Sequence, residues 1–137
     1  MDVNIIKNKM YEYGKIIGLN EQSKEYPIVA ESSRVFPEGA SVYADDILWH
    51  YVAMERGEER VHYESRNLEE ILYYVFKPIT ASLAEKYAVT NRVKGKDFRR
   101  LFFKKQLELL GAIDKKYQKI REDEIAIVLT KAPYQDL

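Results

Sequence analysis

The sequence predicts an α+β fold in a single domain, residues 1–137, with an N-terminal helix, a small antiparallel β-meander of about three strands, and three C-terminal helices packed on one sheet face. Two changes of period support this prediction. Apolar residues recur every three or four positions near the N-terminus and again after residue 67, as in amphipathic helices. Between residues 40 and 65 the period falls to two, which is typical of strands.

Residues 2–17 are expected to form the first helix. Its apolar positions follow helical spacing, and Gly18 comes directly afterwards as a stop: Val3, Ile6, Met10, Tyr13 and Ile17. Residues 19–39 lack such a period. They hold a short apolar patch at Ile28 and Val29 and a turn signal at Phe36-Pro37-Glu38-Gly39, so we expect a loop.

The meander is expected to have turns at Asp45-Asp46 and around Arg56-Gly57, with strands near residues 41–44, 47–55 and 59–65. The length of the second turn decides which side chains share a face. A two-residue loop would oppose Val52 to Val61 and His50 to Tyr63. A three-residue loop at Arg56–Glu58 pairs Val52 with His62, Tyr51 with Tyr63, and Met54 with Arg60.

We favour the three-residue loop because it separates apolar from polar side chains better. One face then carries Trp49, Tyr51, Ala53, Val61 and Tyr63. The other face carries His50, Arg60, His62 and Glu64. In this register the two histidines lie diagonally near each other.

Three helices should follow. Asn67 is a plausible N-cap with Glu70 completing a capping box, and Pro78 should kink or end that helix early. Asp97 should start the next helix and Gly111 should stop it, with a core face of Phe98, Leu101, Phe102 and Leu109. Asp114 should cap a last helix that runs to about Lys131 and is stopped by Pro133.

The composition excludes several classes of protein. The 22 basic and 22 acidic side chains cancel, so the molecule as a whole has no long-range attraction for nucleic acid. The absence of cysteine excludes disulfides and thiolate chemistry and fits a reducing cytosol. No apolar run approaches the length of a membrane span or a signal-peptide core, so we expect a cytoplasmic protein without a membrane partner.

His50 and His62 on one strand face could hold a divalent metal with Glu64 as third ligand. We favour a solvated sheet face with ordinary hydrogen bonds, because the spacing matches no compact metal motif. We therefore expect no catalytic residues, no metal and no cofactor. The alternative is a small metal-dependent hydrolase or nuclease that uses His50, His62 and neighbouring carboxylates. A nuclease site built on Asp46 and Glu55 is disfavoured, since the usual lysine position holds Gly57.

Residues 94–105, KGKDFRRLFFKK, contain six Lys or Arg and one Asp. We favour the interpretation that this stretch forms a solvated helix face. Binding to an acidic protein surface is the second possibility, and binding to nucleic acid is the least favoured, because the basic footprint is small and no recognised module accompanies it.

Two stretches, WHYVAMERGEE and NLEEILYYVFKPITASLAEKYAVTNRVKGKDFRRLFFKKQLELLGAI, resemble the Immunity protein 63 family of bacterial polymorphic-toxin systems. The resemblance covers roughly residues 40–136, including a similar C-terminal segment, Lys131–Asp136. The matching motif residues are Glu55, Arg56, Gly57, Asp97, Phe98, Arg99, Arg100, Gln106, Leu107, Glu108 and Gly111. The N-terminal 39 residues match only as a helix followed by a loop.

The resemblance implies a non-enzymatic antitoxin that binds and neutralises a cognate secreted toxin domain. An inhibitor that occupies a surface needs no catalytic constellation, and interfaces favour Trp, Tyr and Arg as anchors. Candidates for toxin binding or for the scaffold are Trp49, His50, His62, Glu55, Arg56, Gly57, Asp97, Arg99 and Arg100. We favour a scaffold in which Glu55 and Arg56 pair with Asp97, Arg99 or Arg100. Specificity would then lie in the 19–39 loop, the acidic turns and the outer hairpin face.

Overall fold

The computed structural model describes residues 1–33 and 35–137. The chain divides into two compact units, Met1–Phe76 and Lys77–Leu137, called here the N-terminal and the C-terminal unit. The element order confirms the predicted α+β class. Helices in the described part of the chain are too short or too polar to cross a membrane.

Helix α1, Val3–Ile16, confirms the first predicted helix. The Asp2 carboxylate accepts a hydrogen bond from the backbone N–H of Asn4 at 2.9 Å and so caps the N-terminus. Its inner face buries Ile6, Met10 and Gly14. Gly14 lets the Tyr26 ring approach α1 closely, because a Cβ at this position would overlap that ring. Gly18 follows the helix with φ of +91°, a conformation that favours glycine.

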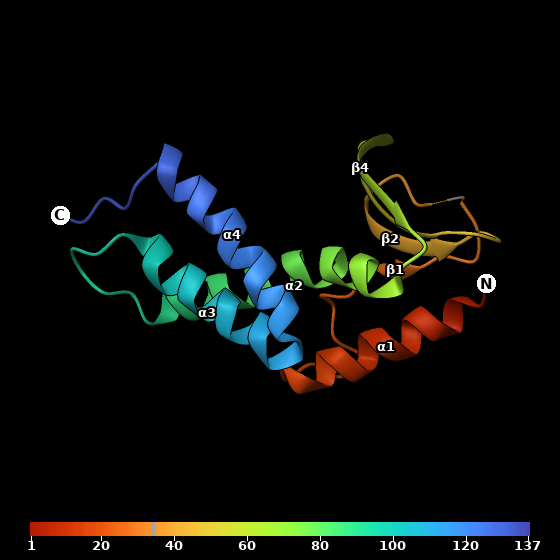
Figure 1. The fold of residues 1–137 in the computed structure, drawn as a ribbon, viewed down its shortest axis with the longest axis horizontal. Helices are drawn as coiled ribbons and strands as arrows, with labels where there is room; N and C mark the ends of the chain where they lie inside the picture. The colour runs from red at the N-terminus through yellow and green to blue at the C-terminus, as the bar shows by residue number, and fades with distance from the viewer. Residues whose placement is uncertain (34) are drawn as a thin grey trace. The chain divides into compact units, whose positions relative to one another are not determined.

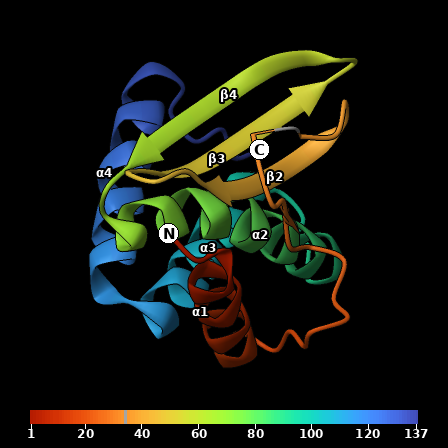
Figure 2. The same cartoon turned by 90° about the vertical axis from the view of Figure 1, so that its right-hand side faces the viewer.

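The sheet of the N-terminal unit has, among the described residues, four strands in the order β1-β2-β3-β4 (Figure 2). Their bounds are β1, Ile28–Val29; β2, Gly39–Ala44; β3, Trp49–Glu55; and β4, Glu58–Ser65. The last three form the predicted antiparallel meander. Strand β1 is an addition to the prediction and pairs in parallel with β2. A strand of two residues is too short to show a period, so the sequence pattern at Ile28 and Val29 could not reveal it.

The hairpin between β3 and β4 turns on two residues, so the predicted three-residue loop is wrong. Arg56 and Gly57 have φ of +53° and +77°, as a type I′ turn requires. A β-bulge near Ala53 and Met54 absorbs one extra residue of β4, Arg60. Met54 therefore pairs with Glu59, whereas its predicted partner was Arg60.

Beyond the bulge, the predicted register is confirmed: Val52 pairs with His62, and Tyr51 pairs with Tyr63. The histidine face is less solvated than expected. A small core cluster of Ala30, Tyr43 and Val52 lies on this side of the sheet, with Val35 and Met54 packed against it.

Helix α2, Leu68–Thr90, begins in the N-terminal unit, where its first turns lie between the sheet and α1 (Figure 1). Asn67 caps it by accepting from the Glu69 N–H at 3.0 Å. The Glu70 carboxylate accepts from the Ser65 hydroxyl instead of closing a capping box. A kink or an early break was predicted at Pro78; the helix continues through this residue, so the early break is wrong.

Aromatic side chains pack the first turns of α2 against their neighbours. Tyr74 stacks on Tyr63 of β4 with ring centroids 3.7 Å apart. On the α1 side, Tyr13 donates a hydrogen bond to the Glu69 carboxylate at 2.8 Å and its ring lies 5.9 Å from that of Phe76. The completely buried residues of these turns are Ile71, Leu72, Val75 and Phe76.

In the C-terminal unit, α3 spans Phe98–Ile113 and α4 spans Lys115–Lys131. The predicted caps are confirmed: Asp97 accepts from the Arg99 N–H at 2.9 Å, and Asp114 accepts from the Lys116 N–H at 2.8 Å. Gly111 lies inside α3, so its prediction as a stop is wrong. A Cβ there would approach the side-chain nitrogen of Gln118 to 2.5 Å, so the glycine permits close packing of α3 on α4.

The buried face of α3 consists of Phe103, Gln106 and Leu110, which corrects the predicted core face of Phe98, Leu101, Phe102 and Leu109. Both sets follow helical spacing and both are largely apolar, so the period alone could not choose between them. Gln106 is completely buried. Its amide donates to the Lys77 carbonyl at 3.0 Å and accepts from Arg121 Nε at 2.9 Å.

Candidate functional site

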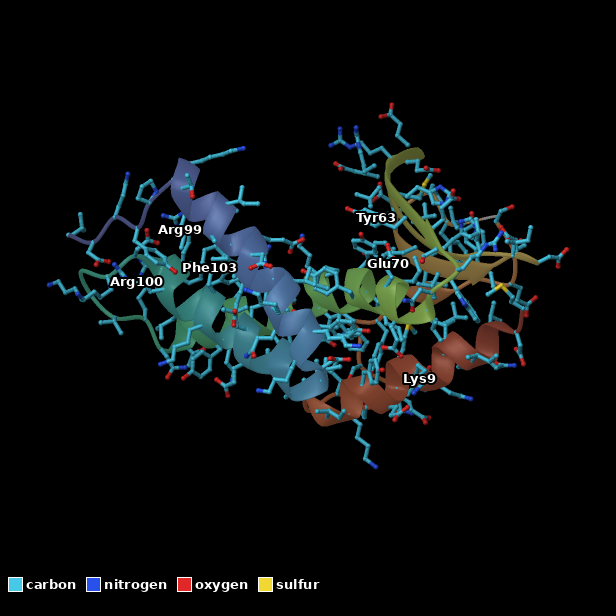
Figure 3. The ribbon with its side chains drawn as sticks, viewed as in Figure 1. Lys9, Tyr63, Glu70, Arg99, Arg100 and Phe103 are labelled. Carbon is cyan, nitrogen blue, oxygen red and sulfur yellow. The ribbon has the colours of Figure 1, made fainter. Side chains whose placement is uncertain are left out.

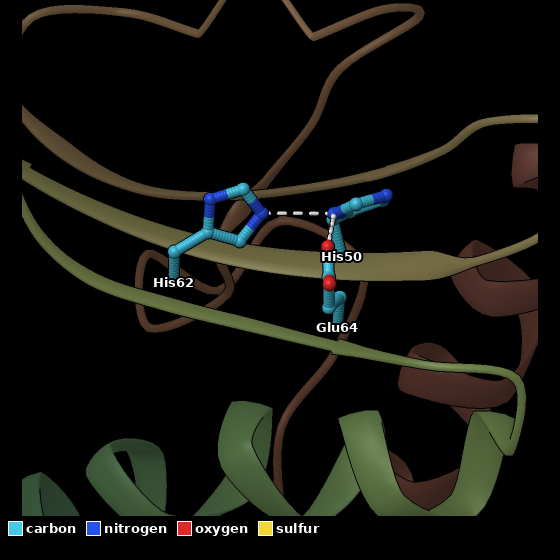
Figure 4. A group of neighbouring side chains, drawn as sticks. All are labelled: His50, His62 and Glu64. Atoms are coloured by element: carbon cyan, nitrogen blue, oxygen red, sulfur yellow. Dashed lines mark hydrogen bonds and ion pairs between the residues drawn. The ribbon is translucent and has the colours of Figure 1, made fainter.

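The hairpin brings the two histidines of the chain together, as the favoured register predicted. His50 on β3 pairs with Glu64 on β4, and His62 lies two residues before Glu64 on the same face. The Nδ1 atom of His50 is 2.8 Å from Nε2 of His62 and 3.7 Å from a carboxylate oxygen of Glu64 (Figure 4). One potential ligand atom from each of these three residues lies within 4.8 Å of the other two. His50 is only 5% exposed, whereas His62 and Glu64 are exposed.

Two further carboxylates hold the outer nitrogens of the rings. His50 Nε2 lies 2.7 Å from Asp45 Oδ2, and His62 Nδ1 lies 2.9 Å from Glu59 Oε1. The sequence placed Asp45 in a turn, but it did not predict that either carboxylate would contact a histidine. Residues 59 and 62 of a regular strand point to opposite faces, but the bulge at Arg60 places Glu59 on the histidine face.

Asp45 is positioned by the turn before β3. Its Oδ1 accepts hydrogen bonds from the backbone N–H groups of Ile47 and Leu48, both at 2.7 Å. These two bonds, and then the bond from His50, lower the pKa of Asp45 to about 2. The carboxylate is therefore ionised at neutral pH and presents its second oxygen to His50.

Tyr43 on β2 forms the floor of this cluster. Its ring stacks on His50 with centroids 4.4 Å apart and planes 7° from parallel. Burial raises the pKa of Tyr43, and the carboxylates of Glu59, Asp45 and Glu64 raise it further. The site therefore carries a concentrated negative charge.

The remaining hairpin candidates have structural surroundings. Trp49 is 6% exposed and belongs to the core. Glu55 lies 3.6 Å from the Arg60 guanidinium, and both side chains are exposed. The turn itself is tied to the preceding loop, because the Arg56 N–H donates to the Glu38 carboxylate at 2.6 Å and the Gly57 N–H donates to the Pro37 carbonyl at 3.0 Å.

Asp97 and Arg99 hold the C-terminal segment, residues 132–137, within the C-terminal unit. The Asp97 carboxylate accepts from the Arg99 guanidinium at 2.9 Å and from the Gln135 N–H at 2.8 Å. These bonds, led by that from the Arg99 side chain, lower the pKa of Asp97 well below its usual range. Arg99 also donates to the carbonyls of Ala132 and Pro133.

Arg100 holds the same segment from the next position of α3 (Figure 3). Its guanidinium lies 3.0 Å from the Asp136 carboxylate and 4.2 Å from the centre of the Tyr134 ring. The basic motif, residues 94–105, therefore uses Arg99 and Arg100 for contacts within the C-terminal unit. Sequence reasoning could not identify these partners, because they lie more than thirty residues away in the chain.

A pocket of about 240 Å³ lies beside this motif, between the end of α2 and the start of α3. Its apolar lining comes from Ala88, Val93, Phe98 and Leu101. Its charged lining comes from Arg92, Lys96, Asp97 and Arg100. The basic run 94–105 suggested the charge, but the apolar floor is formed only when the two helix ends meet.

Comparison with curated proteins and with solved structures found no match. The family model described as Immunity protein 63 matches residues 45–127, which is more than half of the chain. The matched range contains the histidine cluster and the basic motif, and it confirms the resemblance noted in the sequence. This chain belongs to the Immunity protein 63 family.

Proposed function

We propose that this chain neutralises a cognate bacterial toxin by forming a stoichiometric complex with it in the cytoplasm, without catalysing a reaction. The observation that carries this proposal is the family match over residues 45–127. An immunity protein acts by occupying a toxin surface, so the feature to identify is an exposed docking surface.

The pocket beside the basic motif is the docking surface that we favour. Protein interfaces commonly seat one apolar or aromatic anchor in a pocket that is surrounded by polar groups. Here Val93, which is 50% exposed, lines the pocket together with Phe98 and Leu101. Exposed apolar side chains that gather at one place, rather than singly, are typical of an interaction surface.

The charge at the pocket indicates the kind of partner. The side chains of Lys96 and Arg100 are 59% and 46% exposed, and the guanidinium of Arg92 lies over the Phe98 ring at 5.4 Å. The Asp97 carboxylate is already bound by Arg99. A local excess of positive charge on a chain of zero net charge favours a toxin surface that is acidic and presents an apolar side chain.

The same reasoning assigns most of the sequence candidates to the scaffold. Trp49 and His50 are buried, Gly57 is needed for the type I′ turn, and Asp97 and Arg99 are bound to the C-terminal segment. We propose that Arg100 has both roles, because it lines the pocket and also holds Asp136.

The test is co-expression with the toxin domain encoded immediately upstream of this gene. The wild-type chain should rescue growth and co-purify with the toxin. The double variant Arg92→Glu/Lys96→Glu should lose rescue and complex formation. Lys116→Glu is the matched control, since it reverses an exposed charge at the start of α4, away from the pocket, and should retain both. Failure of the wild-type chain to rescue growth would contradict the function, and full rescue by the double variant would contradict the surface.

A metal-dependent hydrolase or nuclease is the second candidate, favoured only by the cluster of His50, His62 and Glu64. The near-complete burial of His50 disfavours it, because a reacting substrate must reach the metal. Hydrolysis of nucleic acid by the purified chain with Mn²⁺, abolished in His62→Ala, would support this candidate against the first.

A further inference from the structure

We propose that His50, His62 and Glu64 form a binding site for a divalent transition-metal ion of the zinc class. Imidazole nitrogens and carboxylate oxygens are ordinary zinc ligands, and three protein ligands leave a fourth position for water. The inference concerns the N-terminal unit and is independent of toxin binding.

The orientation of the two rings is the first argument. The outer nitrogens, His50 Nε2 and His62 Nδ1, each face a carboxylate, which only accepts hydrogen bonds when ionised. These outer nitrogens therefore carry the ring hydrogens. In neutral rings, the inner nitrogens then present lone pairs to each other across 2.8 Å. Two facing lone pairs at this distance need a cation between them, and either a shared proton or a metal ion can occupy that position.

The outer carboxylates are the second argument. Metal-binding histidines usually donate their other ring N–H to a carboxylate or carbonyl, which fixes the tautomer and makes the ring a stronger ligand. Asp45 does this for His50, and Glu59 does it for His62. Asp45 is itself held by two backbone N–H groups, and the His50 ring is stacked on Tyr43, so this half of the site is fixed in place.

The charge and the geometry of the histidine cluster also fit a zinc ion. Three carboxylates surround two rings that are neutral when they act as ligands, so the site attracts a dication. A tetrahedral zinc ion would hold the two nitrogens about 3.3 Å apart, given bonds of about 2.0–2.1 Å. The rings need to separate by only about half an ångström, and the exposed Glu64 can close the third side.

Calorimetric titration of the chelator-treated, untagged chain with zinc chloride near neutral pH tests the proposal. We expect one zinc ion per chain and an increase in the thermal unfolding midpoint. His62→Ala should abolish both effects, and Glu64→Ala, at an exposed position, should weaken binding without loss of fold. Asp45→Asn should weaken binding by about 10- to 100-fold, the usual effect of removing an outer partner.

Glu58→Gln is the control, because Glu58 is an exposed carboxylate of the same strand that pairs with Arg60. It should leave zinc affinity unchanged. Cobalt(II) bound in place of zinc should give the intense visible absorption of a four-coordinate ion. The proposal is overturned if millimolar zinc chloride gives no binding heat, or if His62→Ala and Glu64→Ala bind zinc as the wild-type chain does.

Discussion

Replacing Gln106 by alanine should destabilise the C-terminal unit by about 3 kcal/mol. The side chain is completely buried and makes three hydrogen bonds. The bonds to the Lys77 carbonyl and the Thr80 hydroxyl are neutral and are each worth about 1 kcal/mol. The bond from the Arg121 guanidinium is charged and is worth about 2 kcal/mol.

The expected destabilisation is smaller than the sum of these three bonds, because two of the partners keep other interactions. The Lys77 carbonyl still accepts from the Thr80 hydroxyl at 3.1 Å, and Arg121 keeps its ion pair with Glu124. Urea unfolding followed by circular dichroism measures the loss. With a urea slope of about 1.5 kcal/mol per molar, the midpoint should fall by about 2 M.

Two further variants test whether the buried hydrogen bonds of Gln106 cause the loss of stability. Gln135→Ala removes the same side chain from an exposed position and should change the free energy of unfolding by less than about 0.5 kcal/mol. Gln106→Leu keeps most of the volume but leaves the Arg121 and Lys77 groups without this partner, so it should remain destabilised. If Gln106→Ala and Gln135→Ala unfold at the same urea concentration, the buried amide is not the stabilising element inferred here.

Three other predictions follow from the structure. Gly14→Ala should destabilise α1 by about 1–3 kcal/mol because its Cβ overlaps Tyr26; urea unfolding should show a smaller loss in a Tyr26→Phe background, which removes the hydroxyl nearest that Cβ. Asp97→Asn should lower the free energy of unfolding at neutral pH, and its difference from wild type should shrink as pH falls below about 4, because Arg99 lowers the pKa of Asp97 in the folded state. Because α2 runs through both units, Trp49 fluorescence and helical circular dichroism should report one coincident thermal transition; separate transitions would contradict a single domain.

Local signals in the sequence determined much of the secondary structure. Helix α4 was predicted at both ends, since Asp114 supplies an N-cap and Pro133 prevents continuation. The proximity of His50 and His62 was also predictable, because a period of two places them on one face of the hairpin. These features depend on residues that are close in sequence.

Tertiary contacts decided what local patterns left open. Helix α3 has two comparable apolar stripes, and the packing of Gly111 against Gln118 and of Gln106 around Arg121 decides which is buried. Two partners of Asp97, Gln135 and Asp136, lie in a segment that has no secondary structure of its own. No period in the sequence encodes such contacts.

The histidine site shows the same division. The sequence determined which ligand types face each other, but a single bulge residue, Arg60, decides that Glu59 reaches His62. A bulge depends on the balance between turn geometry and strand pairing, and the sequence alone suggested a longer turn instead. The carboxylates that orient both rings were therefore visible only once the backbone was folded.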